Sequence, residues 1–219
     1  QRTEALATLS NELRSQGLVN NWRDELFSIY LDVDRNNEIF RLERGVVPLL
    51  ALQAHGVHLN GYVMIHDRPH VWIGQRSANR VIAPLKYDQL VAGGLPAQLS
   101  LKENLYKEAQ EEAGIPKKLI DPAKYVGKIQ YKTEDEFGIR NDVLHCYDLE
   151  LPQDFVPHNQ DGEVEQFLCL PIPEIVQLLQ KEDQFKPNTA LVMLNFLVRH
   201  DWISVDDSGY QAIMESFSI

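Results

Sequence analysis

The chain has 219 residues, of which 44% are hydrophobic and 24% charged, and its formal net charge at pH 7 is −11. This composition is ordinary for a globular protein. The acidic balance and the lack of any Lys or Arg run exclude a protein that coats the phosphate backbone of nucleic acids. No stretch of 18 apolar residues occurs, so we expect no membrane-spanning segment and no membrane partner.

The two cysteines and the N-terminal segment bear on the compartment. Cys146 and Cys169 each lie inside an apolar, strand-like run, which predicts two buried, reduced thiols rather than a disulfide. Residues 1–11 are polar and helix-like, and they lack the apolar core of a signal peptide. These features favour a cytoplasmic protein. Nothing in the sequence indicates an oligomeric state.

The first elements in chain order are helical. Apolar side chains in residues 3–30 recur at helical spacing and predict helical structure that is interrupted near Gly17. A short extended run follows around residues 39–42. We expect residues 1–54 to form a small N-terminal lobe.

A different pattern begins at Val57. Residues 57–65 alternate apolar and polar side chains, a turn follows, and residues 70–74 form a second extended run, which together predict a hairpin. The remaining predicted strands are 125–131, 143–151 and 164–170, and the predicted helices are 101–113, 173–181 and 189–200. Strands in both hairpin-like and helix-separated arrangements predict an α/β sandwich with a mixed sheet, in a domain over residues 55–219.

The helix over residues 101–113 carries the most informative pattern. Ser100 and Glu103 form a capping box that starts it, and Gly114 ends it. Glu108, Glu111 and Glu112 stand at positions i, i+3 and i+4, and therefore on one face, where like charges repel by about a few tenths of a kcal/mol per pair. A hard divalent cation would offset this repulsion, because Mg²⁺ is held by a few carboxylates together with phosphates and water.

Three acids at this spacing, taken alone, more often indicate a solvated acidic face. The flanking glycines change that balance. Gly93 and Gly94 precede the helix across a short loop and permit close backbone approach to a ligand. Gly114 then ends the helix at a fixed distance from the glutamates. We therefore favour the metal-site interpretation.

Residues 93–115 resemble the Nudix box, G-x5-E-x7-R-E-U-x-E-E-x-G-U. Gly93 aligns with its first glycine, and residues 107–115 align with its C-terminal half. Two positions depart from the pattern, since Leu99 stands where the first glutamate is expected and Lys107 replaces the arginine. Lysine keeps the charge but loses the bidentate fork. The resemblance implies a Nudix α/β/α sandwich and a hydrolase of phosphoanhydride bonds, which uses Mg²⁺, or Mn²⁺ in its place, held by Glu108, Glu111 and Glu112.

The resemblance extends to one Nudix branch, the proteins related to thiamine pyrophosphokinase. The segments that carry it are Asn21–Leu26, Leu42–Arg44, His55–Tyr62, Trp72–Ser77, Asp161–Phe167 and Phe185–Asn188. This branch has an N-terminal extension before its Nudix domain, which accounts for the first 50 residues. Its members convert thiamine diphosphate, and preferentially oxidised forms of it, to the monophosphate. The resemblance therefore implies this small-molecule substrate.

Such a substrate presents flat rings and a diphosphate, so its binding site needs aromatic side chains beside the rings and cations for the phosphates. Trp72 and Tyr62 lie on predicted strands and are candidate ring-binding residues, although aromatic side chains at such positions more often pack in a core. Arg76 and Lys86 are candidate phosphate-binding cations, with ordinary surface charge as the alternative.

A second acidic segment, Asp161-Gly162-Glu163-Val164-Glu165, follows a proline-containing loop. Nudix enzymes often take a further metal ligand or the general base from such a distant loop. Glu163 and Glu165 are therefore candidate catalytic residues, and they would point to one side if both lay in the strand. The alternative is a turn with exposed acids.

Other functions find less support in the sequence. His55 and His58 have H-x-x-H spacing but lack neighbouring Cys or His residues, so zinc is not expected. No G-x-S-x-G elbow and no P-loop occurs. Three alternatives stay open: a Nudix hydrolase of another nucleoside-diphosphate-type substrate, a non-catalytic ligand-binding Nudix module, and an isomerase on the same fold.

Overall fold

The computed structural model describes residues 1–203, and the last part of the predicted domain, residues 204–219, lies outside the described residues. The chain divides into two compact units that are interleaved in sequence. The first unit comprises residues 1–56, 94–104 and 130–144, and the second comprises residues 57–93, 105–129 and those from 145 onward. The predicted division into a lobe over 1–54 and a domain over 55–219 stays a prediction.

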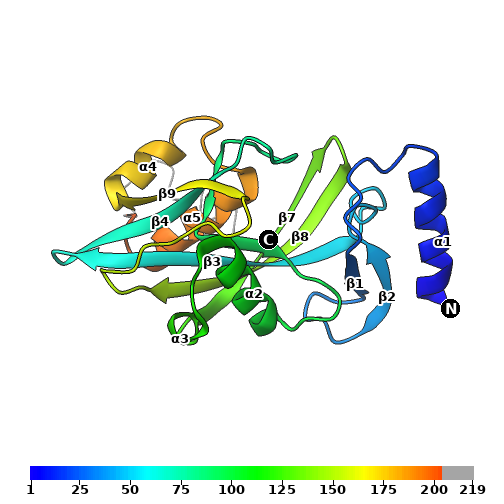
Figure 1. The fold of residues 1–219 in the computed structure, drawn as a ribbon, viewed down its shortest axis with the longest axis horizontal. Coiled ribbons are helices and arrows are strands. Elements are labelled where there is room, and N and C mark those ends of the chain that lie inside the picture. Colours follow the sequence, from blue (N-terminus) through cyan, green and yellow to red (C-terminus); the bar gives the residue numbers. More distant parts are fainter. Residues whose placement is uncertain (204–219) are drawn as a thin grey trace. The chain divides into compact units, whose positions relative to one another are not determined.

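The first unit begins with helix α1 (Arg2–Ser15), followed by the antiparallel pair β1 (Leu26–Tyr30) and β2 (Glu38–Glu43) (Figure 1). The extended run at residues 39–42 is thereby confirmed. The predicted helix over 3–30 is correct for α1 and wrong for β1. The spacing of Trp22, Leu26 and Ile29 fits a helix, but the three consecutive buried residues 27–29 pair with β2 instead.

The main sheet has seven strands in the order β5-β4-β3-β8-β7, with β6 paired to β3 and β9 paired to β4. The strands are β3 (Gln53–Ile65), β4 (Arg68–Arg76), β5 (Tyr87–Gln89), β6 (Val91–Gly94), β7 (Lys124–Asp135), β8 (Gly138–Glu150) and β9 (Val164–Pro171). The predicted hairpin of β3 and β4 and the strands β7, β8 and β9 are confirmed. The sequence did not reveal β5 and β6, because three or four residues are too few to show a period.

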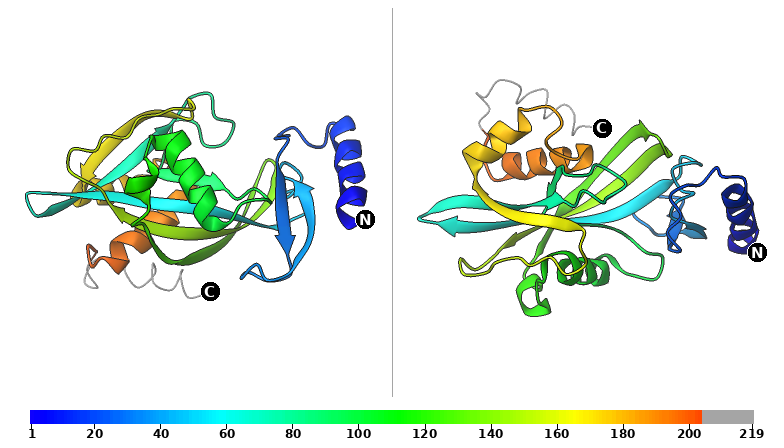
Figure 2. Two further views of the ribbon diagram at one scale, coloured as in Figure 1. Left: turned by 60° about the horizontal axis from the view of Figure 1, so that its bottom comes forward. Right: turned by 45° about the horizontal axis from the view of Figure 1, so that its top comes forward.

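Four helices accompany this sheet: α2 (Leu101–Ala113), α3 (Lys117–Ile120), α4 (Ile172–Leu179) and α5 (Pro187–Arg199). In the second unit, α4 and α5 cover one face of strands β4 and β9, and the C-terminal part of α2 lies on the other face (Figure 2). The predicted α/β sandwich is confirmed. No helix within residues 1–203 has the length and apolar character needed to cross a membrane.

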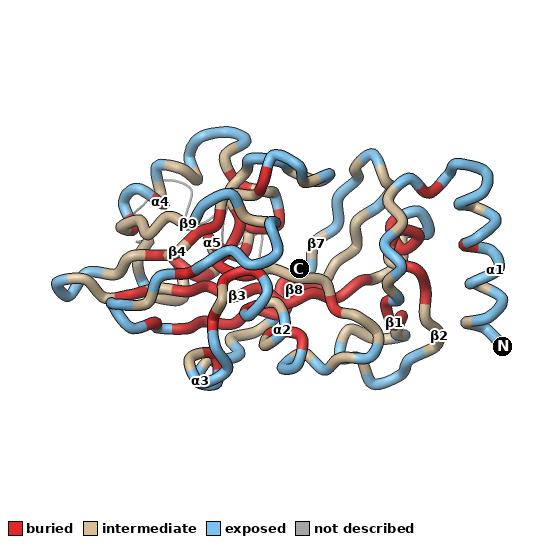
Figure 3. The backbone as a smooth tube through the Cα atoms, in the orientation of Figure 1, coloured by how far each residue is buried: buried red, intermediate tan, exposed pale blue. Residues whose placement is uncertain are grey.

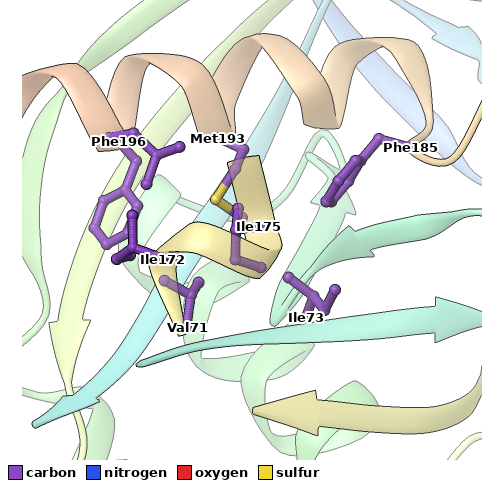
Figure 4. Close-up of a cluster of buried hydrophobic side chains, with 8 residues drawn as sticks. Val71, Ile73, Ile172, Ile175, Phe185, Met193 and Phe196 are labelled. Atoms are coloured by element: carbon purple, nitrogen blue, oxygen red, sulfur yellow. The ribbon is translucent and has the colours of Figure 1, made fainter. Parts of the chain in front are cut away.

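The core of the second unit lies between the sheet and the helices α4 and α5. Val71 and Ile73 of β4 point toward Ile175 of α4 and toward Met193 and Phe196 of α5 (Figure 4). All five residues are fully buried, and buried residues, in red, lie along β4 and α5 (Figure 3). Because side chains alternate along a strand, the residues between Val71 and Ile73 and on either side of them face the α2 side of the sheet.

We expect Ile73→Ala to destabilise the protein by about 2–5 kcal/mol, because it leaves a cavity in a fully buried core. The measurement is the free energy of unfolding from urea titration. Val81→Ala is the matched control, since the Val81 side chain is 57% exposed and its loss should cost less than about 0.5 kcal/mol. Equal losses for the two variants would contradict this account of the core.

Candidate active site

Helix α2 begins and ends where the sequence predicts. The Glu103 backbone N–H donates to Ser100 Oγ at 3.2 Å, and the Ser100 N–H donates to Glu103 Oε2 at 2.9 Å, which completes the capping box. Gly114 adopts the left-handed conformation, with φ of +62°, directly after the helix. A residue with a side chain would be strained there. These ends fix which residues of α2 share a face.

Gly93, at the end of β6, makes room for Glu108. A Cβ atom at position 93 would lie 2.2 Å from Glu108 Cδ and 2.6 Å from Glu108 Oε1. The side chain of Glu108 is only 13% exposed, so it lies against the backbone of this strand. The first glycine of the box therefore determines the place of the first core glutamate.

Glu112 is the most buried of the three glutamates. Its Oε2 accepts the backbone N–H of Ala92 at 2.8 Å, and 9% of the residue is exposed. Burial raises the pKa of the Glu112 carboxyl well above its usual value, and the negative charge of Glu108 raises it further. Asp88 and Glu163 add to this effect, while the hydrogen bond from Ala92 opposes it. Negative charges from its own helix, from β5 and from the loop before β9 thus act together on Glu112.

Glu111 lies at the outer edge of this group, with 49% of its side chain exposed. The ammonium of Lys107 lies 2.8 Å from Glu111 Oε2, at the i, i+4 spacing of a helical ion pair, and 3.2 Å from Glu108 Oε1. Partial burial lowers the pKa of Lys107, but its hydrogen bond to Glu111 and the charge of Glu108 outweigh that effect and raise the pKa. Lys107 therefore stays charged and neutralises part of the acidic face.

The donor set is compatible with a divalent cation. Among residues 1–203, no three Asp, Glu, His or Cys side chains stand close enough together to enclose a metal ion by themselves. Mg²⁺ does not need such a cage, because it usually takes one or two carboxylates and completes its shell with water and substrate phosphates. The oxygen-only chemistry of Glu108 and Glu112, and the unbalanced negative charge around Glu112, fit that requirement.

The loop before β9 places Glu163 near this acidic group. Its backbone is held by side-chain acceptors, since Asn159 Oδ1 accepts the N–H of Gly162 at 2.9 Å and Asp161 Oδ1 accepts that of Glu163 at 2.8 Å. The loop also contacts the end of α2, where the N–H of His158 donates to the Ala113 carbonyl at 3.0 Å. Glu163 lies close enough for its charge to raise the pKa of Glu112. Glu163 thus adds negative charge to the surroundings of Glu112.

Glu165 does not accompany Glu163. Strand β9 pairs Gln166 with Gln75 and Val164 with Arg76, so Glu165 is the extra residue of a β-bulge. Glu163 precedes the strand, and the regular alternation that would place both acids on one side is interrupted. Glu165 is exposed. Its predicted catalytic role stays a prediction.

Arg76 anchors the loop that follows β4. Its guanidinium donates to the carbonyls of Ile82 at 2.9 Å and Ala83 at 3.2 Å, and Nη1 lies 2.9 Å from Asp88 Oδ2. Lys186 lies 3.2 Å from the same oxygen of Asp88. Burial raises the pKa of Asp88, but the charges of Lys186 and Arg76 outweigh that effect and hold the pKa well below its usual value. Arg76 is therefore engaged within the protein.

Two further candidate substrate contacts, Lys86 and Gly94, interact with other parts of the protein. Lys86 Nζ lies 2.8 Å from Asp183 Oδ1. Gly94 belongs to the first unit, where a Cβ atom would lie 2.6 Å from the Phe27 ring and 3.3 Å from the Arg44 guanidinium. Gly94 is therefore required for local packing. The predicted substrate contacts of Lys86 and Gly94 stay predictions.

The two candidate ring-binding residues lie on opposite faces of the sheet. Tyr62 pairs with Val71 and thus shares its face, where the Tyr62 ring lies 5.9 Å from Phe196 and 5.8 Å from Trp202. Trp72 faces the α2 side. Its buried Nε1–H has no hydrogen-bond acceptor within residues 1–203. Of the two, Trp72 offers a hydrogen-bond donor that a ligand could use.

Sequence reasoning assigned no role to three charged residues of this region, Arg80, Asp88 and Lys186. Lys186 lies within a segment that carries the family resemblance, and Asp88 shortly precedes the apolar run Leu90-Val91-Ala92. A lone acid beside apolar strand residues predicts a buried ion pair, but only the structure identifies Arg76 and Lys186 as its partners. No sequence signal linked Arg80 to Glu163.

Comparison with known proteins gives a consistent family. The family model described as "NUDIX domain" matches residues 58–191. Among similar sequences, Nudix hydrolase 20, chloroplastic, from Arabidopsis thaliana is 42% identical over 209 residues, covering 95% of this chain and 56% of its own length. Nudix hydrolase 24, chloroplastic, from the same plant is 42% identical over 210 residues, covering 96% and 57%. The chain thus spans little more than half the length of these relatives.

Solved structures show the same fold at low sequence identity. The crystal structure of DR0079 from Deinococcus radiodurans aligns with a TM-score of 0.58 and 16% identity, covering 82% of this chain and 100% of that one. The NUDIX domain of Shewanella oneidensis NrtR, crystallised with ADP ribose, aligns with a TM-score of 0.52 and 14% identity, covering 69% and 89%. Likeness at these identities concerns the fold alone.

We expect Gly93→Ala to lower kcat/KM of any hydrolytic activity by about tenfold or more, with little change in stability. The new Cβ would meet the flexible end of Glu108, which can swing aside without disturbing the core. If Glu108 carries the whole effect, adding Gly93→Ala to Glu108→Ala should cause no further loss. A clear additional loss in the double variant would show that Gly93 acts through something other than Glu108.

Proposed function

The chain belongs to the NUDIX domain family, and we propose that it is a Mg²⁺-dependent hydrolase of a phosphoanhydride bond in a small diphosphate substrate. The observation that supports this most directly is the placement of two α2 glutamates against β6, where Gly93 leaves room for Glu108 and the Ala92 N–H donates to Glu112. The charges of Glu108, Asp88 and Glu163 all raise the pKa of Glu112, and a divalent cation held there would offset this negative charge.

In this proposal Glu108 and Glu112 would hold the cation, with Glu111 as a further ligand from the exposed edge of α2. When bound, Mg²⁺ neutralises phosphate charge and supplies Lewis-acid chemistry. Gly93 keeps Glu108 in place, and the Ala92 amide fixes Glu112. Glu163, fixed by the 158–163 loop, would accept the proton of the attacking water as general base.

For the substrate we propose thiamine diphosphate or its oxidised analogues, converted to the monophosphate and phosphate. The near full-length resemblance to the branch related to thiamine pyrophosphokinase supports this class. The open Nε1–H of Trp72 is a second support, because an unpaired buried donor costs about 1–3 kcal/mol, which an acceptor on a heterocyclic ligand would offset. Lys86 and the anchored Arg76 remain the proposed cations for the phosphates, and Tyr62 a proposed contact.

A nucleoside-diphosphate-type substrate is the second candidate, since the Shewanella NUDIX domain of the same fold was crystallised with ADP ribose. The isomerase alternative has less support. It would want an acidic side chain such as cysteine in the pocket, whereas burial raises the pKa of the Cys146 thiol to about 12 and that of Cys169 to about 11. The predicted cytoplasmic location stays a proposal, and the names of two relatives place those proteins in the chloroplast.

We expect diphosphatase activity that is lost in excess EDTA and restored by Mg²⁺ or Mn²⁺. Glu112→Gln should lower kcat by about 100-fold or more, because it removes a charge from the proposed cation site. The amide oxygen can still accept the Ala92 N–H, and one repelling charge is gone, so the unfolding free energy should stay equal or rise. Full turnover in EDTA, or a Glu112→Gln variant within about threefold of wild type, would contradict the metal site.

We expect kcat/KM for thiamine diphosphate and oxothiamine diphosphate to exceed that for ADP-ribose and a nucleoside diphosphate. The uncharged oxidised ring should be accepted at least as well as the cationic thiazolium, because an apolar wall disfavours desolvation of a charge. All four compounds are compared under one set of conditions. If ADP-ribose or the nucleotide is preferred by about tenfold, or about 1.4 kcal/mol in transition-state binding, the thiamine assignment is wrong while the hydrolase assignment survives.

A further inference from the structure

The loop over residues 77–86, which joins β4 to β5, is held by hydrogen bonds, and its apolar side chains Val81 and Leu85 are not packed in a core. Arg76 holds it through the carbonyls of Ile82 and Ala83, and the Leu85 N–H donates to the Arg76 carbonyl at 3.1 Å. Val81 and Leu85 are nevertheless more than half exposed. The Arg76 guanidinium thus anchors the loop, and the exposed side chains of the loop are available to a ligand.

Arg80 lies in this loop and forms an ion pair with Glu163. A backbone bond fixes the same junction, since the Ser77 N–H donates to the Glu163 carbonyl at 2.9 Å. The backbone of Arg80 is fixed as well, because its N–H donates to the Ser77 carbonyl at 3.1 Å. Two independent contacts therefore hold the loop over residues 77–86 against Glu163, the proposed general base.

The guanidinium of Arg80 has capacity for another acceptor. Nη1 meets Glu163, and no other side-chain donor of Arg80 has an acceptor within residues 1–203. The side chains of Arg80 and Glu163 are 24% and 37% exposed, so an anion can reach the pair from solvent. Arg76 differs, because its Nε, Nη1 and Nη2 all donate to protein acceptors. Arg80 is thus the better placed of the two to exchange partners.

We propose that Arg80 neutralises Glu163 in the substrate-free protein and transfers to a phosphate of the diphosphate when substrate binds, which frees Glu163 for the reaction. This inference rests on the proposed function. A phosphate carries more charge than one carboxylate and offers paired oxygens to a planar guanidinium, so it competes favourably for Arg80. Released Glu163 then adds its full negative charge to the surroundings of Glu112. Arg80 thus acts both through Glu163 and as a direct contact of the substrate phosphate.

The exchange predicts effects of opposite sign for one substitution. In Arg80→Ala, Glu163 loses its counter-charge, so the substrate-free protein should bind Mn²⁺ about threefold or more tighter than wild type. The same variant lacks a phosphate contact, so KM for the diphosphate should rise about tenfold. A merely structural role would weaken both. Mn²⁺ affinity is measured by isothermal titration calorimetry, and KM with the best substrate of the diphosphate panel.

Three further variants sharpen the test. Arg68→Ala removes an equal charge from the exposed start of β4 in the same unit and should change neither quantity. Adding Arg80→Ala to Glu163→Gln should leave the Mn²⁺ affinity of the Glu163→Gln single variant unchanged, because the freed carboxylate is absent. Arg80→Lys keeps the charge without the fork, and it should restore wild-type Mn²⁺ affinity while recovering only part of the loss in KM.

The outcomes separate this inference from the proposed function. A wild-type protein that binds Mn²⁺ and hydrolyses a diphosphate, while Arg80→Ala binds Mn²⁺ equally or more weakly, overturns the exchange and leaves the hydrolase intact. An unchanged KM in Arg80→Ala overturns it as well. A wild-type protein that neither binds Mn²⁺ nor hydrolyses any diphosphate of the panel removes the proposed function and the exchange with it.

Discussion

The buried carboxylate of Glu112 constrains everything around it. A carboxylate removed from water needs compensation, and within the described residues Glu112 receives one direct hydrogen bond, from the Ala92 amide. That amide belongs to β6, so the short strand and helix α2 must keep their register for the bond to form. Gly93, the next residue, admits Glu108 to the same place. The box glycine and the box glutamates are therefore parts of one packing arrangement.

The other acids that affect Glu112 belong to two separate ion-pair groups. In one group Asp88 is deeply buried with Arg76 and Lys186, whose charges keep it ionised. In the other group the more exposed Glu163 pairs with Arg80. A buried pair with several partners is costly to break, whereas an exposed pair contributes little and exchanges readily. The Asp88 group thus suits a fixed framework, and the Arg80 pair suits a contact that changes when substrate arrives.

Much of this framework could be predicted from sequence, because its signals are local. The capping box and Gly114 gave the bounds of α2, and period-two alternation located β3 and β4. Prediction was wrong at β1, where Leu26 and Ile29 fit a helical spacing that pairing with β2 overrides. The contacts of Glu163 and Asp88 could not be predicted, since both depend on which distant strands and loops meet. The bulge at Glu165 likewise arises from register with β4.

The substitution of lysine for the box arginine also has a structural reason. An arginine fork makes two parallel bonds to one carboxylate, whereas a lysine ammonium is a point charge with three rotatable donors. Lys107 uses that freedom, because its Nζ lies within 3.2 Å of both Glu108 and Glu111. It therefore divides one positive charge between two repelling acids and leaves Glu112 without a share. Within the described residues the most buried carboxylate of the site thus has a backbone hydrogen bond but no share of the Lys107 charge, and a divalent cation would supply that charge.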